Sequence, residues 1–94
     1  MNTKQFHQLC SDLTHLKTQA DFALFLKDLC TPGELRAFTG RWGVAEMLTH
    51  GVPYRKIYEK TGVSTATVTR VARCLADVKG GYNMLIERKR KKQT

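Results

Sequence analysis

The chain has 94 residues, of which 41% are hydrophobic and 26% charged, a size and composition that fit one small globular domain. No apolar run approaches the roughly 18 residues of a membrane span. Residues 1–13 alternate polar and apolar side chains and do not resemble a signal peptide, so we expect a cytoplasmic protein with no membrane contact.

The net charge of +8 lies in the second half of the chain. Residues 1–50 hold five basic and five acidic residues, whereas residues 51–94 hold eleven basic and three acidic residues. Clustered cations gain free energy by displacing the counterions of a polyanion, so this asymmetry favours a nucleic-acid partner. For the run ERKRKK at residues 87–92, the alternative is a solvated tail that binds only loosely.

The sequence offers little for metal binding or catalysis. Cys10, Cys30 and Cys74 form no pairing pattern and are expected to be buried free thiols. His7 and His15 could join Cys10 in a metal site only with a fourth ligand, and neither CxxC nor HExxH occurs. Without an activated nucleophile or a phosphate-binding loop, we expect no enzyme and no metal.

Apolar spacing predicts helices throughout the first half. Apolar residues recur at helical intervals over 6–16 and again over 22–29. Thr31, Pro32 and Glu34 predict the start of a third helix, with a capping box and a proline at its first position. This helix should end at Gly51.

The third helix carries an expected inward stripe of Leu35, Phe38, Trp42, Ala45 and Leu48. It also holds Gly40 and Gly43, which cost about 1 kcal/mol each relative to alanine. Close approach of another helix explains them better than room for a ligand.

In the second half, a short helix carrying Ile57 follows Pro53, and Ser64 caps a fifth helix that runs to about Val78. After the break at residues 80–81, a last helical segment over residues 82–86 dissolves into the basic tail. Strand-type alternation is absent, so the chain reads as all-α.

The two helices within residues 53–78, joined by a turn at Gly62, predict a helix-turn-helix. Ile57, Val63, Val68 and Val71 are placed to hold these helices together. The outward face of the second helix is small, hydroxylated and cationic, which suits a helix that enters the major groove of DNA. We expect base contacts from Thr65, Ala66 and Thr69; phosphate contacts from Arg55, Lys56, Lys60 and Ser64; guanine or phosphate contacts from Arg70 and Arg73; and either a groove contact or an internal bond from Thr67.

Two ordered motifs, TPGELRAFTGR at residues 31–41 and TGVSTATVTR at residues 61–70, resemble the tryptophan repressor family. The likeness covers about Leu26 to Leu75. It implies a single domain over residues 1–94 with a six-helix tryptophan-repressor-like fold that intertwines with a second copy as a homodimer. Residues 1–51 would be dimerisation helices, 53–78 the helix-turn-helix, and 81–94 the last helix and basic tail.

In the tryptophan-sensing members of that family, the ligand lies between the third and fifth helices. The positions that match this effector pocket are Thr31, Arg41, Thr67, Arg70 and Val71. Val71 replaces a glycine that leaves space for the ligand, and Cys74 replaces a serine. We therefore expect no tryptophan cofactor and a place near the tryptophan-repressor-like YerC/YecD-type branch. Gly43 leaves room for another small effector.

The resulting hypothesis is a homodimeric, nucleoid-associated, bacterial-type transcription regulator. It would bind double-stranded DNA sequence-specifically and repress from a palindromic operator whose half-site centres lie about one turn, roughly 34 Å, apart. One alternative is the DNA-targeting domain of a recombinase or transposase. Another is an RNA-binding or assembly protein that uses the basic tail.

Overall fold

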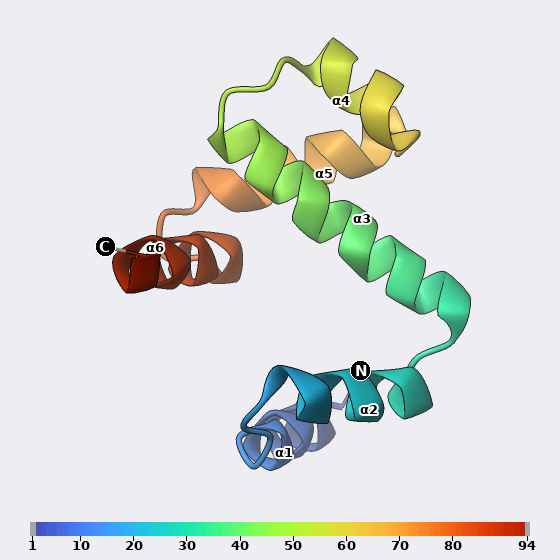
Figure 1. Cartoon of the computed structure of the whole chain (residues 1–94), viewed down its shortest axis with the longest axis vertical. Coiled ribbons are helices and arrows are strands. Elements are labelled where there is room, and N and C mark those ends of the chain that lie inside the picture. The colour runs from blue at the N-terminus through green and yellow to red at the C-terminus, as the bar shows by residue number, and fades with distance from the viewer. Residues whose placement is uncertain (1, 94) are drawn as a thin grey trace. The chain divides into compact units, whose positions relative to one another are not determined.

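The computed structural model describes residues 2–93, which form six α-helices and no strand (Figure 1). The helices are α1 (Thr3–Leu13), α2 (Gln19–Leu29), α3 (Pro32–Thr49), α4 (Tyr54–Thr61), α5 (Thr65–Ala76) and α6 (Gly81–Gln93). The predicted all-helical, six-helix class is confirmed.

Capping boxes fix the starts of α2 and α3. The Thr18 hydroxyl accepts a hydrogen bond from the Asp21 N–H at 3.1 Å, and the Asp21 carboxylate accepts from the N–H groups of Lys17 and Thr18. The predicted box at Thr31 is confirmed, with Glu34 accepting from the Thr31 N–H at 2.8 Å and donating its own N–H to the Thr31 hydroxyl at 3.1 Å. Backbone hydrogen bonds favour the charged carboxylates, so those from Lys17 and Thr18 lower the pKa of Asp21, and that from Thr31 lowers the pKa of Glu34.

The chain divides into two compact units, residues 1–35 (the N-terminal unit) and residues 36–94 (the C-terminal unit). In the N-terminal unit, α1 and α2 contain no buried residue. Their large apolar side chains are exposed at Phe6, Phe22, Leu24 and Leu29. Because apolar burial is the main favourable term in folding, this unit gains little from its own packing. The predicted role of residues 1–51 in dimerisation stays a prediction.

The core of the C-terminal unit is formed by α3, α4 and α5. Its fully buried side chains, at most 1% exposed, are Val44, Ala45, Ile57, Val68 and Val71. Partly buried residues pack around them: Trp42, Met47, Leu48, Val52, Tyr58, Val63, Leu75 and Tyr82. The inward placement predicted for the apolar residues of the helix-turn-helix is confirmed.

Some expectations about burial are wrong. Cys10 and Cys74 are exposed and Cys30 is half-buried, so the cysteines do not form core. Phe38 is 46% exposed. It lies on the same side of α3 as Ala45 but about 10 Å nearer the start of the helix, away from the buried residues of the core.

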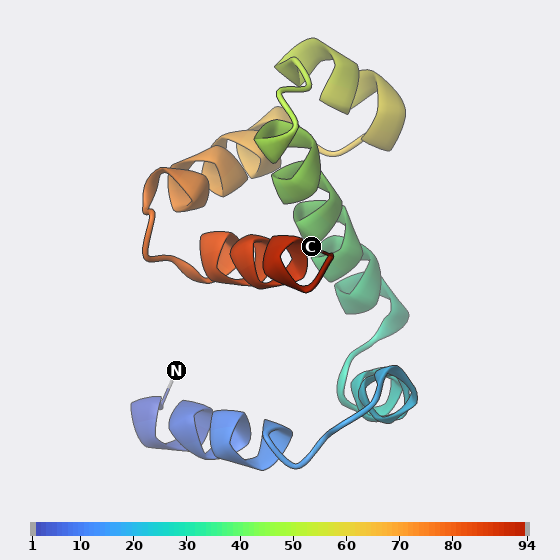
Figure 2. The ribbon, with the colours of Figure 1, turned by 60° about the vertical axis from the view of Figure 1, so that its left-hand side comes forward.

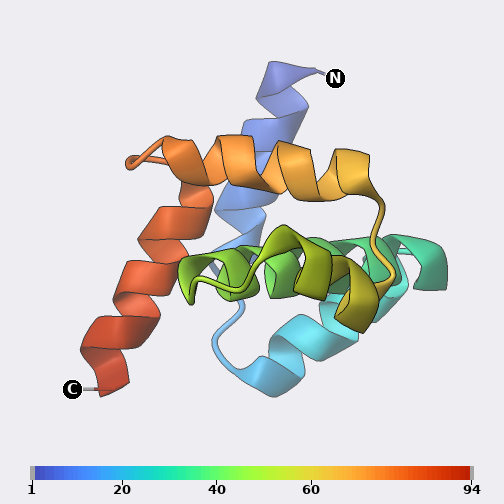
Figure 3. The same cartoon turned by 90° about the horizontal axis from the view of Figure 1, so that it is seen from above.

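The end of the chain also differs from the expectation. α5 stops at Ala76, because Asp77 has an extended backbone. The basic run is helical instead of dissolving, since α6 continues to Gln93. As Figures 2 and 3 show, α6 follows the end of α5 and passes beside the C-terminal part of α3. There the Lys89 ammonium donates to the Glu46 carboxylate at 2.6 Å, a contact between residues 43 positions apart that local sequence patterns do not reveal.

Candidate nucleic-acid interface

The turn between α4 and α5 is fixed by backbone and side-chain bonds. Gly62 has a left-handed backbone, with a φ of 68°, and its N–H donates to the Tyr58 carbonyl at 3.0 Å. This conformation favours glycine because it carries no Cβ. The Thr61 hydroxyl donates to the Ile57 carbonyl at 2.7 Å and accepts from the Val63 N–H at 3.1 Å. The start of α5 is thereby held in place relative to α4.

One side of α5 is buried and the other is not. Val68 and Val71 are in the core, together with Ile57 of α4. The opposite side, which we call the reading face, is exposed and consists of Thr65, Ala66, Thr69, Arg70 and Arg73. The structure therefore gathers these five predicted contact residues on one accessible face of the C-terminal unit.

Ser64 and Thr67 bond to each other at the start of α5. The Ser64 hydroxyl accepts from the Thr67 N–H at 3.2 Å and donates to the Thr67 hydroxyl at 2.9 Å. Ser64 is thus the predicted N-cap. Thr67 is half-buried and makes an internal bond, one of the two roles left open for it. The N–H groups at the first positions of such a helix lack intrahelical acceptors and favour an anion.

The exposed side of α4 is cationic. Arg55, Lys56 and Lys60 are all exposed. Glu59 is the one acidic residue in the sequence from Tyr54 to Ala76, and its carboxylate lies 3.4 Å from Arg55. The Arg55 side chain is 90% exposed, and exposed pairs of this kind contribute little stability. Arg55 can therefore exchange this carboxylate for a phosphate at small cost.

Four of the residues predicted to form an effector pocket lie in the C-terminal unit, and these four do not share one cavity. Arg41 and Thr67 line a cavity of about 170 Å³ together with Gly40 and Val63. Arg70 and Cys74 line another, wider hollow of about 450 Å³ beside the start of α6. Val71 is 1% exposed and belongs to the core. Thr31 lies in the N-terminal unit, where its hydroxyl and N–H are engaged in the capping box.

The two glycines of α3 differ in their surroundings. A Cβ on Gly40 would lie 3.5 Å from Cγ2 of Val63, an ordinary van der Waals contact, so the turn approaches α3 there. A Cβ on Gly43 would meet nothing within 4 Å. A Cβ would therefore fit at either position, so the expected close approach of another helix is not found at Gly40 or Gly43 within the described chain.

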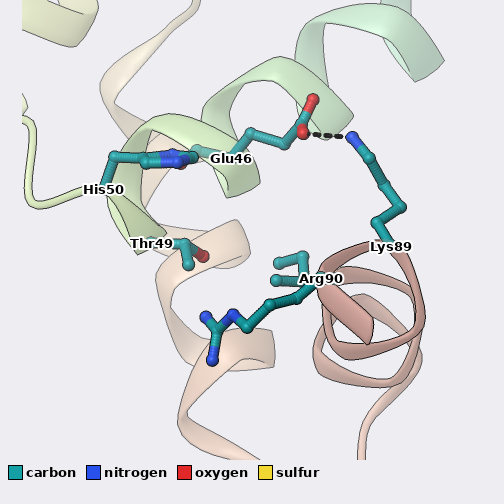
Figure 4. Close-up of a pocket in the computed structure, with 6 residues that line it drawn as sticks. Glu46, Thr49, His50, Lys89 and Arg90 are labelled. Atoms are coloured by element: carbon teal, nitrogen blue, oxygen red, sulfur yellow. Dashed lines mark hydrogen bonds and ion pairs between the residues drawn. The ribbon is translucent and has the colours of Figure 1, made fainter. Parts of the chain in front are cut away.

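A cluster between α3 and α6 was not predicted from the sequence. The Lys89 ammonium, bonded to Glu46, also lies 5.4 Å from the centre of the Trp42 ring, and Trp42 stacks on Tyr82 at 6.2 Å. Beside this cluster is a cavity of about 210 Å³ lined by Glu46, Thr49, His50, Ile86, Lys89 and Arg90 (Figure 4). Among the described residues, no group of three or more His, Cys, Asp or Glu side chains is arranged to hold a metal ion.

Comparison with known proteins identifies the family. The family model described as Trp repressor protein matches residues 4–90. The chain belongs to the Trp repressor family. This match confirms the resemblance seen in the two sequence motifs. Members of the Trp repressor family are helix-turn-helix DNA-binding regulators and not enzymes. No helix within residues 2–93 is both long and apolar enough to cross a membrane.

Individual relatives agree with this assignment. The chain is 38% identical over 91 residues to the uncharacterised protein YerC of Bacillus subtilis (strain 168), covering 97% of this chain and 88% of YerC. A candidate Trp repressor from Staphylococcus aureus has a similar structure, with a TM-score of 0.85 and 30% identity over 95% of this chain and 89% of that one. A TrpR-like protein from Eubacterium eligens ATCC 27750 gives a TM-score of 0.79 and 37% identity, covering 93% and 90%.

Proposed function

We propose that this Trp repressor family chain is a sequence-specific transcription regulator that binds double-stranded DNA as a homodimer and represses from a palindromic operator. The observation that carries the proposal is the reading face of α5. Its short and cationic side chains are exposed, while Val68 and Val71 on the opposite face of the helix are buried in the core. A helix with this arrangement can bring its backbone close to base edges in the major groove.

Charge supports the same assignment. Arg55, Lys56 and Lys60 on α4 are exposed beside a reading face that carries Arg70 and Arg73. Cations in this arrangement can position a helix-turn-helix by contacting phosphates on both sides of the groove, and they supply affinity that does not depend on sequence. Specificity is left to the short residues of the reading face.

The homodimer is supported by the apolar surface of the N-terminal unit. Phe6, Phe22, Leu24 and Leu29 are each more than 40% exposed, a pattern typical of a face that another surface covers. Twofold symmetry would present two copies of α5 to one duplex, and this geometry predicts a palindromic site. A small DNA-binding domain then acts most simply as a repressor, by occupying a promoter.

We further propose that tryptophan is not the effector. Val71 places its side chain in the core, where the tryptophan-sensing members leave space, and Arg41 and Arg70 line separate cavities. Titration calorimetry with free L-tryptophan is expected to show no stoichiometric binding at micromolar affinity. Such binding would contradict this part of the proposal. Another small effector remains compatible with the open space beside Gly43.

The main proposal is tested by selecting bound fragments from a genomic library at physiological salt. We expect the recovered sites to share a palindrome with half-site centres about one helical turn, roughly 34 Å, apart. Recovery of fragments with no common sequence would contradict sequence-specific binding. A common sequence without twofold symmetry would contradict the homodimer and would agree better with a DNA-targeting domain of another kind.

Binding through the basic tail alone is less well supported. Lys89 is engaged by Glu46 and Trp42, and the run at residues 87–92 belongs to α6. If RNA binding through the tail were the function, replacing Arg88 and Lys92 with glutamine would weaken binding to all nucleic acids and lower the salt slope by roughly two units. If the reading face of α5 binds DNA instead, this variant should keep its preference among DNA sequences.

A further inference from the structure

The connection from α5 to α6 is a closely bonded turn around Asp77. The Asp77 carbonyl accepts from the Gly80 N–H at 2.9 Å, and its carboxylate accepts from the Lys79 N–H at 3.0 Å. A Cβ on Gly80 would lie 3.1 Å from the Asp77 carbonyl oxygen and 3.4 Å from that of Cys74. These are backbone atoms, so a side chain at Gly80 would require the backbone of the turn to shift by a few tenths of an ångström.

Asn83, in the first turn of α6, bonds directly to the end of α5. Its side-chain amide nitrogen donates to the carbonyls of Leu75 and Asp77, at 2.9 Å each. The last carbonyls of a helix have no intrahelical donor, and Asn83 supplies one where α5 ends. Because both neighbours are acceptors, an NH₂ group can satisfy both, a hydroxyl only one, and a carboxylate neither.

α6 is itself held on the body of the C-terminal unit. The Lys89 ammonium bonds to Glu46 at 2.6 Å and lies over the ring of Trp42, which stacks on Tyr82. α6 can therefore serve as a fixed support, and Asn83 joins the C-terminal end of α5 to it. This support lies at the opposite end of α5 from Thr65, Ala66 and Thr69.

We propose that Asn83 is a positioning residue for DNA reading: by holding the C-terminal end of α5 on α6, it sets the direction of the recognition helix and hence the separation of the two reading faces in the dimer. This inference rests on the proposed function. A helix of 12 residues is about 18 Å long, so a tilt of about 10° at one end moves the other by about 3 Å. That displacement is close to the rise of one base pair, about 3.4 Å.

The test compares the selected palindrome with versions in which one central base pair is added or removed. Wild-type protein is expected to prefer the selected spacing by roughly tenfold or more. Asn83→Asp has the same shape but no donor, and Asn83→Ala has neither donor nor charge. For both variants we expect the preference to fall to within about threefold, because α5 is no longer held in one direction when the two hydrogen bonds are lost.

Asn2 provides a matched control. Its side-chain oxygen accepts from the Gln5 N–H at 3.1 Å, so Asn2→Asp introduces the same charge and keeps the bond. This variant should keep the wild-type spacing preference. Because the preference is a ratio measured on one sample, a smaller folded fraction does not change it. Asn83→Ser, which keeps one donor, should give an intermediate ratio and serves if Asn83→Asp does not fold.

The outcomes separate this inference from the function on which it rests. Folded Asn83 variants that keep the wild-type spacing preference would overturn the role of Asn83 and leave the proposed function standing. Wild-type protein that prefers no duplex over another would instead contradict the proposed function. A lower affinity with an unchanged spacing ratio would assign Asn83 a structural role alone and would also overturn the inference.

Discussion

Threonine and valine have nearly the same shape, yet α5 places Thr65 and Thr69 on the face opposite Val68 and Val71. Val68 and Val71 are at most 1% exposed, whereas Thr65 and Thr69 are exposed. Burying a hydroxyl without a hydrogen-bond partner costs roughly 1–3 kcal/mol, so the distribution of hydroxyls selects which face turns inward. The same hydroxyls and methyl groups are then available for contacts with base edges.

Lys56 and Lys60 of α4 are expected to contact phosphates. Lys56→Ala should weaken binding to all duplexes alike, because a phosphate contact carries no sequence information. The slope of log K against log salt should flatten by roughly one unit per lost contact, as measured by titrations over a range of salt concentrations. Lys60→Ala should behave in the same way.

Lys4→Ala is the control for this prediction, since Lys4 is an exposed lysine of α1 in the N-terminal unit. It removes the same charge and is expected to leave the slope unchanged. If Lys56→Ala reduced affinity at one base position only, Lys56 would be a base contact and its phosphate role would be wrong.

At the scale of helices, the capping boxes link stability to pH. The backbone N–H of Thr31 lowers the pKa of Glu34 in the folded protein. A lowered pKa means that the carboxylate contributes stability above its ordinary pKa of 4.5, and that this contribution is lost as the pH falls through the folded value. Glu34→Gln keeps a side-chain oxygen that can accept from the Thr31 N–H but has no titrating proton.

The expected outcome concerns the pH dependence of unfolding by denaturant. Between about pH 5 and pH 3, wild-type protein should lose more of its free energy of unfolding than Glu34→Gln does. Asp28→Asn, which changes an exposed carboxylate of α2 outside both capping boxes, is the comparison and should follow the wild-type pH profile. Identical pH profiles for wild type and Glu34→Gln would show that the box contributes nothing that depends on charge.

Helix starts could be read from the sequence more reliably than helix ends. Thr31, Glu34 and Ser64 act on backbone groups within three residues, so local spacing reveals them. The end of α5 and the course of α6 depend on Asn83 and on the contact of Lys89 with Glu46, which joins distant parts of the chain. The spacing of apolar residues does not reveal such long-range contacts, so the sequence did not predict that the basic run is helical.

Part of the candidate interface could be predicted from the sequence, and part of it could not. The reading face and its buried support follow from the spacing of apolar residues along one helix, and the sequence was sufficient to place them. The effector positions could not be placed, because whether Arg41 and Arg70 meet depends on how helices pack. Phe38 is exposed for a similar reason. Apolar spacing identifies the side of α3 that faces the core, but it does not show which part of α3 the neighbouring helices cover.

At the scale of the molecule, the exposed apolar side chains of the N-terminal unit predict self-association. Leu24 is 72% exposed, and covering a leucine stabilises an interface by about 2 kcal/mol. Sedimentation should show a wild-type dimer, and Leu24→Glu should shift it toward monomer. Gln19→Glu, at the start of the same helix, adds the same charge without apolar loss and should remain dimeric. A wild-type monomer at all concentrations would contradict the proposed twofold assembly.

The groove-reading role of α5 is tested most directly by placing a carboxylate on the reading face. Thr65→Glu and Thr69→Glu each direct a negative charge toward the groove and should reduce affinity for the selected palindrome by roughly a thousandfold or more, to the level of unrelated duplexes. Thr3→Glu, which makes the same change on α1, should bind like wild type. Equal footprints for Thr65→Glu, Thr69→Glu and wild type, from proteins with equal melting temperatures, would show that α5 does not read the groove.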